Sequence, residues 1–127
     1  MTTTKVIRET EAHHQETLIT WCQVKLNRYP ELKWLYHIPN GGSRNRMEAA
    51  ALKRQGVKAG VPDLCLPIAR GGYHGLYIEL KVGKNTPTEM QTEWLEQLKR
   101  SGYYTGVAYG WEAAATALEN YLNLKGR

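Results

Sequence analysis

Three side chains in the middle of this chain are of types that could bind a divalent metal ion and activate water. Asp63 follows Pro62 directly, and Glu79 and Lys81 lie two residues apart in the run Leu76–Val82. Side chains alternate across a strand, so Glu79 and Lys81 would face the same side. Two neighbouring carboxylates repel each other unless a cation lies between them, and Mg²⁺ prefers one or two carboxylates with water and phosphate oxygens. The pattern therefore predicts a metal site in which the lysine assists a water molecule or stabilises developing charge.

The same residues have a simpler interpretation. Glu79 and Lys81 could form a surface salt bridge on a half-exposed strand, and Pro-Asp often begins a strand or turn. If the residues do form a site, the backbone carbonyl of Leu80 is a further candidate metal ligand. The three side chains alone leave both interpretations open, so the elements that carry them must be considered.

Four short segments have the composition of β-strands. We expect strands at Lys33–Ile38, Asp63–Ile68, Leu76–Val82 and Tyr103–Tyr109. The turn Arg70-Gly71-Gly72 predicts that the two central strands are antiparallel, and a helical crossover lets the last strand return parallel. In such a hairpin, the carboxylate of Asp63 can approach that of Glu79.

Helical patterns separate and flank these strands. We expect helices over Glu11–Tyr29, Ser43–Gln55, Pro87–Ser101 and Trp111–Leu122. Ser43 and Thr86 are the expected N-caps, and Glu89 would complete a capping box with Thr86. The order α β α β β α β α predicts an α/β fold, a mixed β-sheet flanked by helices. We expect a single domain over residues 11–127, after a flexible segment at 1–10.

Two apolar stripes are expected to face the core from these helices. The first helix carries Leu18, Cys22 and Leu26 at four-residue spacing, and the third carries Met90, Trp94 and Leu98. For the second stripe, packing in the core is a better interpretation than stacking on nucleic-acid bases.

Composition narrows the classes of partner and compartment. The 127 residues carry a net charge of +5, which favours a polyanion such as nucleic acid, although a soluble protein can be basic without one. Cys22 and Cys65 lie in apolar stretches with no CxxC spacing, which predicts reduced core thiols and argues against a zinc site. The chain shows no signal-peptide pattern and no stretch of transmembrane length, so we expect a cytoplasmic protein with no membrane partner.

The segments around the three residues resemble one known family. Gly56–Leu64 (GVKAGVPDL) is similar to the GxKxGxPDL segment of VRR-NUC domains, the virus-type replication-repair branch of the PD-(D/E)xK nucleases. Glu79–Lys81 matches the E-x-K of that family, and Asn40–Gly42 with Arg44 resembles its NGG region. Thr88, Gln91, Trp94 and Leu98 resemble its (S/T)xxQxxWxxxL helix. The likeness extends from about Glu11 to the last helix.

This resemblance implies a restriction-endonuclease-like fold and hydrolysis of phosphodiester bonds in DNA with Mg²⁺, for which Mn²⁺ should substitute. It also implies a fourth acidic residue from the first helix, for which Glu16 is the best match and Glu11 the alternative. Gln91 would help to hold the site by contacting the attacking water or Lys81. The expected metal ligands are then Asp63, Glu79, the Leu80 carbonyl and Glu16.

Basic residues gather between the NGG region and the Pro-Asp pair. The candidates for DNA contacts are Arg44, Arg46, Lys53, Arg54 and Lys58. Gly41, Gly42 and Gly60 would let the backbone approach phosphates closely. A solvated helix face is the alternative interpretation of these charges.

Family members that consist of this domain alone are similar to stand-alone phage-type nucleases. The resemblance therefore implies a homodimer that cuts branched DNA such as four-way junctions, with two sites related by a two-fold axis. Two alternatives remain open from the sequence. The chain could be a non-catalytic DNA-binding or assembly module, or a nuclease acting on flaps, plain duplex or RNA.

Overall fold

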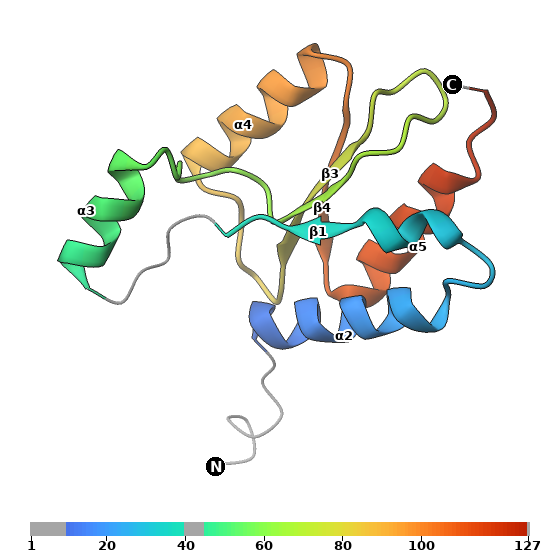
Figure 1. Ribbon diagram of the computed structural model, residues 1–127, viewed down its shortest axis with the longest axis horizontal. Helices are drawn as coiled ribbons and strands as arrows, with labels where there is room; N and C mark the ends of the chain where they lie inside the picture. Colours follow the sequence, from blue (N-terminus) through green and yellow to red (C-terminus); the bar gives the residue numbers. More distant parts are fainter. Residues whose placement is uncertain (1–9, 40–44, 127) are drawn as a thin grey trace, which may run out of the picture.

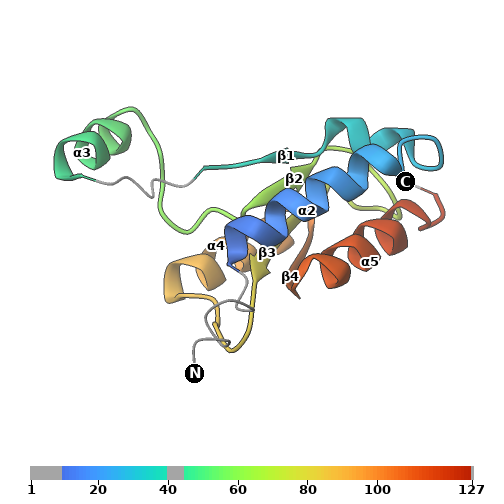
Figure 2. The same cartoon turned by 90° about the horizontal axis from the view of Figure 1, so that it is seen from below.

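A four-stranded mixed β-sheet lies between two layers of helices, with α4 on one face and α2 and α5 on the other (Figures 1 and 2). The computed structural model describes residues 10–39 and 45–126. Its strands are β1 (Tyr36–His37), β2 (Leu64–Leu66), β3 (Leu76–Lys81) and β4 (Tyr104–Tyr109). Its helices are α2 (Glu11–Val24), α3 (Arg46–Arg54), α4 (Glu89–Arg100), α5 (Trp111–Leu122) and the 3-10 helix η1 (Pro30–Trp34). The predicted α/β fold and element order are confirmed.

The strands lie side by side in the order β1-β2-β3-β4. Strand β2 pairs antiparallel with β3, with Leu64 opposite Ile78, because the tight turn between them is closed by a bridge from Arg70 to Tyr73. Strand β4 returns parallel to β3 after the α4 crossover, which sets Glu79 opposite Val107. Both predicted strand directions are therefore correct.

One face of the sheet forms the hydrophobic core with α2 and α5. Alternate residues of β2 and β3 point to this face and are fully buried against the two helices. The principal residues of this core are Leu18, Leu64, Leu66, Leu76, Ile78, Leu80, Leu118 and Tyr121. The core thus holds Ile78 and Leu80 inward and leaves the residues between and after them on the opposite face.

The first helix is shorter than predicted, and the strand after it is much shorter. Helix α2 ends at Val24, five residues before Tyr29, and Leu26 is 36% exposed outside the helix. The intervening turn brings Tyr29 and Leu32 back into the core, where both are buried. Pro30 then begins the 3-10 helix, so only Tyr36 and His37 of the predicted strand pair with β2. Packing of this turn against the core outweighs the helical and β patterns of the local sequence.

Two helix starts also differ from the prediction. Asn45 caps α3, with its Oδ1 accepting from the Glu48 amide at 2.7 Å, while the predicted cap Ser43 lies outside the described residues. Thr88, not Thr86, caps α4: its hydroxyl accepts from the Gln91 amide, and Gln91 Oε1 accepts from the Thr88 amide. The capping box is therefore formed by Thr88 and Gln91, two residues after the predicted pair of Thr86 and Glu89, because the Gln91 side chain reaches back to the Thr88 amide.

Helix α3 stands apart from the layered body in both views (Figures 1 and 2). A cavity of about 640 Å³ lies between α3 and α4, lined in part by Leu52, Val57, Met90 and Trp94. Met90 is 52% exposed, and Trp94 and Leu98 are only partly buried. The prediction that this α4 stripe lies in the core is therefore wrong for Met90, because α3 does not close over it.

None of the helices described in the structure is long and apolar enough to cross a membrane.

Candidate active site

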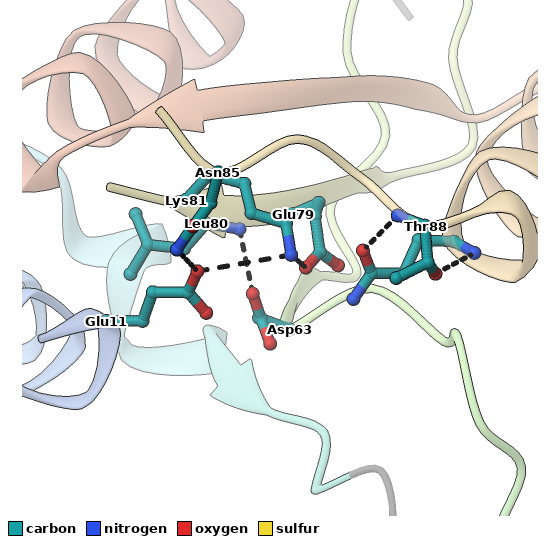
Figure 3. Close-up of polar contacts among 8 residues, drawn as sticks. Glu11, Asp63, Glu79, Leu80, Lys81, Asn85 and Thr88 are labelled. Carbon is teal, nitrogen blue, oxygen red and sulfur yellow. Dashed lines mark hydrogen bonds and ion pairs between the residues drawn. The ribbon is translucent and has the colours of Figure 1, made fainter. Parts of the chain in front are cut away.

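The β2–β3 register brings Asp63 beside Glu79. Leu64 is opposite Ile78, so continuing the antiparallel register by one residue places Asp63 opposite Glu79. Asp63 Oδ2 accepts a hydrogen bond from the Leu80 amide at 2.8 Å (Figure 3). The side chain of Asp63 therefore continues the ladder just before the start of β2, and its carboxylate is held against β3.

Strand β1 fixes the same residue from the other side. The Asp63 carbonyl accepts from the Ile38 amide at 2.7 Å and lies 3.0 Å from His37 Nδ1, the position of a donated ring N–H. His37 thus has a structural role, since it anchors the backbone of Asp63. Burial raises the pKa of the Asp63 carboxyl, and the hydrogen bond from Leu80 opposes that rise.

Glu79 is the most unusual group in the site. It is only 1% exposed, and within the described part of the chain its Oε1 has no hydrogen-bond partner. Burial raises the pKa of Glu79 to about 7, and repulsion from Asp63 adds to the rise. A buried carboxylate oxygen without a partner is costly, which indicates a position made for a bound cation or a proton.

Lys81 lies between two acidic side chains. Its Nζ is 3.6 Å from Glu79 Oε2 and 3.9 Å from Glu11 Oε2 (Figure 3). Lys81 is 7% exposed and Glu79 still less, so the pair is not the surface salt bridge of the simpler interpretation. A surface ion pair would contribute little to the free energy of unfolding. A buried pair loses hydration free energy, which further hydrogen bonds or charges must offset.

The Leu80 carbonyl points to the edge of β3 that faces Asp63. The Leu80 amide donates to Asp63, and in an extended strand the N–H and C=O of one residue share an edge. The next carbonyl, that of Lys81, accepts from the Gly110 amide at 2.8 Å on the β4 side, as this alternation requires. The Leu80 carbonyl is therefore on the same side as the two carboxylates.

This donor set fits a hard divalent cation. Across the described residues, no three His, Cys, Asp or Glu side chains gather closely enough to hold a metal by themselves. The site offers two carboxylates and a strand carbonyl, and one carboxylate oxygen has no partner in the described part of the chain. Mg²⁺ uses such ligands when water and substrate phosphate complete its shell. A closed structural site of zinc type is not formed by these residues.

The acidic residue that α2 brings to this site is Glu11, the alternative, and not Glu16. Glu11 Oε2 lies near Lys81 Nζ and accepts from Asn85 Nδ2 at 3.3 Å, and its charge adds to the raised pKa of Asp63. Glu16 is exposed on α2. The two residues are five apart, about 140° around a helix, so they cannot face the same site. Asn85 was not predicted, and its place just after the E-x-K strand was the only signal.

Gln91 lies at the start of α4, where its side-chain oxygen is used by the capping box. It orders the N-terminus of the helix that follows the E-x-K strand. A contact of Gln91 with Lys81 or with the attacking water stays a prediction.

Four of the predicted DNA-contacting residues lie on or after α3. Arg46, Lys53, Arg54 and Lys58 are all exposed, while Arg44, Gly41 and Gly42 lie outside the described residues. Gly60 has a packing role: its φ is +92°, and a Cβ there would lie 2.9 Å from the Met90 backbone. The loop that leads to Pro62 and Asp63 can therefore pack against α4 only with glycine at this position.

A mixed sheet that joins Pro-Asp at the start of one strand to Glu-x-Lys on the next defines the PD-(D/E)xK class of nucleases. The family model described as "VRR-NUC domain" matches residues 4–112, and the chain belongs to this nuclease family. A solved structure described as a "VRR_NUC domain protein" is similar, with 37% sequence identity and a TM-score of 0.79. That likeness covers 93% of this chain and 92% of the other. The comparison with curated proteins found no match.

Proposed function

We propose that this chain is a metal-dependent DNA endonuclease that hydrolyses phosphodiester bonds. One observation carries the proposal. The buried carboxylate of Glu79, one oxygen of which has no hydrogen-bond partner among the described residues, lies opposite Asp63 and beside Lys81. Such an arrangement costs folding free energy in the absence of a cation, because two carboxylates are desolvated together. A divalent cation that also binds a phosphate would offset this cost and connect the site to a polyanionic substrate.

The residues have separate tasks in the proposed reaction. Asp63, Glu79 and the Leu80 carbonyl would hold Mg²⁺ or Mn²⁺, and the bound metal would polarise the scissile phosphate and lower the pKa of a water. Lys81 orients the attacking water, and its charge stabilises the negative charge that develops on the phosphate. Glu79 and Glu11 keep the ammonium of Lys81 in place from two sides. In-line attack leaves a 5′-phosphate and a 3′-hydroxyl.

Branched DNA such as a four-way junction is the proposed substrate, and a homodimer is the proposed form. Both rest on the resemblance to stand-alone phage-type members of the family. The exposed basic residues of α3 support DNA as the polyanion, because they lie on a helix that projects from the body (Figure 1). Arg46, Lys53, Arg54 and Lys58 would neutralise phosphates in a way that depends on salt and not on sequence.

A panel of substrates under equal salt tests the proposal. Junction, flap, linear duplex and RNA are incubated with the protein and Mg²⁺ or Mn²⁺, with Lys81→Ala as the control. We expect cleavage of the junction above the others, dependence on the metal, and loss of cleavage in Lys81→Ala. Cleavage of flaps, duplex or RNA in preference would correct the substrate but keep the chemistry.

Calorimetry separates the nuclease from a non-catalytic module that kept the fold. Titration with Mg²⁺ should show binding that Glu79→Gln removes. A protein that binds no metal and cleaves none of the substrates, while still binding DNA, would overturn the proposed activity.

A further inference from the structure

The sheet face that carries the candidate active site also carries a row of three side chains, two tyrosines with a cysteine between them. Tyr36 on β1 is opposite Cys65 on β2, and Cys65 is opposite Tyr77 on β3. Residues directly opposite one another share a face, and Tyr77 shares its face with Glu79 by strand alternation. Tyr36, Cys65 and Tyr77 therefore lie on the same side of the sheet as Glu79 and Lys81, one step further along the strands.

This row differs in exposure from one end to the other. Helix α4 packs over β3 and β4, and Tyr77 is partly buried there, where its ring meets that of Tyr103 at 5.2 Å between centroids. Cys65 is 4% exposed. Tyr36, at the β1 end, is 49% exposed. The open end of the row is thus a single aromatic side chain on the active-site face.

Tyr36 lies directly across the sheet from the buried Cys65. The neighbouring Cys65 thiol and partial burial raise the pKa of the Tyr36 phenol. An ordered, exposed aromatic ring is suited to stacking on a nucleic-acid base, which is sequence-tolerant because every base has a π-face.

The distance from the site is also suitable. Tyr36 is two strands and two residues from Glu79, about 12 Å at about 4.8 Å between strands and about 3.4 Å per residue. That span corresponds to about three nucleotides at the 3.4 Å rise per nucleotide of a duplex. A strand whose phosphate lies at Glu79 would therefore bring a base over Tyr36.

We propose that the Tyr36 ring stacks on a base of the bound DNA, about three nucleotides from the phosphate held at Asp63 and Glu79. The inference rests on the proposed nuclease function, since it takes the DNA to run across this face. It gives a role to an exposed aromatic that the metal site does not use. Stacking on an unpaired base would also favour DNA with branches or distorted ends over continuous duplex.

Binding is measured without cleavage in an Asp63→Asn background, by fluorescence anisotropy of a labelled four-way junction. Tyr36→Ala should weaken binding about tenfold, while Tyr36→Phe and Tyr36→Trp stay within about twofold. Tyr73→Ala is the matched control, because Tyr73 is an exposed tyrosine in the turn at the other end of the β2–β3 hairpin and should leave affinity unchanged. Equal affinity of Tyr36→Ala and the parent would overturn the proposal, as would a Tyr36→Phe protein as weak as Tyr36→Ala.

A second experiment measures stacking directly and does not require the Tyr36→Ala variant to fold. A 2-aminopurine base is placed at successive positions on both sides of the cleavage point, and its fluorescence is compared between the parent and Tyr36→Leu. We expect a Tyr36-dependent change about three nucleotides from the cleavage point and none far from it. Identical profiles, with both proteins folded by circular dichroism, would contradict stacking. Cleavage by the unmodified protein is scored separately, so failure of the nuclease and failure of the stacking contact give different results.

Discussion

Asp63 Oδ2 accepts a hydrogen bond from the Leu80 amide at 2.8 Å, so a side chain takes the place of a backbone carbonyl just before the start of β2. The bond has two consequences. It satisfies an amide at the edge of β3, and it holds the Asp63 carboxylate beside Glu79 before any cation binds. The geometry of the proposed metal site is therefore set by the pairing of the sheet itself.

Two substitutions of Asp63 should separate these consequences. Asp63→Asn keeps an oxygen that can accept from Leu80, whereas Asp63→Ala leaves that amide without its partner. We expect both to lose cleavage by at least about 1,000-fold, because a metal ligand is lost. Only Asp63→Ala should lower the free energy of unfolding, by about 1 kcal/mol. Urea titration of the metal-free proteins measures this, and equal destabilisation by the two variants would contradict the role given to the hydrogen bond.

Stability of the metal-free protein should depend on pH through Glu79. Its pKa is raised from 4.5 to about 7 in the folded state, so the folded state binds the proton more tightly than the unfolded state. The contribution of Glu79 to the free energy of unfolding is then highest below pH 4.5. It falls as pH rises toward about 7, by on the order of 2 kcal/mol. Glu79→Gln should remove this slope and be the more stable protein at pH 8. A slope that is the same in both proteins would show that other groups cause it.

Mg²⁺ should compete with the same proton. Because the metal binds the carboxylate and not the acid, its affinity should fall as pH decreases below about 7. Calorimetric titration at several pH values measures this, with proton release detected in buffers of different ionisation enthalpy. Affinity independent of pH would indicate that Glu79 is not a ligand.

Glu11 and Glu16 give a matched pair on one helix. Glu11→Gln removes the charge that faces Lys81 and Asp63, and we expect cleavage to fall about tenfold, the equivalent of about 1.4 kcal/mol in the transition state. Glu16→Gln changes an exposed residue and should alter cleavage by less than about twofold. Steady-state rates at saturating Mg²⁺ give the comparison. A larger effect of Glu16→Gln would restore the assignment first made from the sequence.

Two glycines test the loop that precedes Asp63. Gly60 and Gly56 both have positive φ, +92° and +103°, but a Cβ would meet the Met90 backbone at 2.9 Å only at Gly60. Gly56→Ala should therefore cost about 1 kcal/mol of backbone strain, and Gly60→Ala clearly more, with a loss of cleavage because Pro62 and Asp63 shift. Thermal unfolding and cleavage rates are measured on both. Equal effects of the two variants would argue that the close approach to α4 is unimportant.

His14 should contribute to the stability of the helix layer. Its Nδ1 accepts from the Trp111 amide at 3.0 Å, and Gly110 provides α5 with no side-chain cap of its own. His14→Ala should lower the free energy of unfolding by about 1 kcal/mol, the usual cost of a lost N-cap. Gln23→Ala, at an exposed position of the same helix, is the control. No difference between the two in urea titration would contradict the capping role.

Local patterns in the sequence were sufficient for the central part of the site. Strand alternation put Glu79 and Lys81 on one face, and the short turn at Arg70–Gly72 required the antiparallel hairpin that brings Asp63 to Glu79. These inferences hold because the period of a strand and the reach of a tight turn are set by neighbouring residues. The element order and strand directions follow from the same local rules.

Tertiary packing decided what local rules leave open. The rotation of α2 against the sheet decides which of its carboxylates contacts Lys81. Leu18 and Cys22 in the core fix that rotation, so Glu11 contacts Lys81 and Glu16 does not. The burial of Glu79 and the exposure of Met90 and Tyr36 likewise depend on which helices cover which face. Such contacts join residues far apart in the chain, so local patterns cannot predict them. The sequence by itself determined the type of site, and only the fold determined which further residues belong to it and which of them are buried.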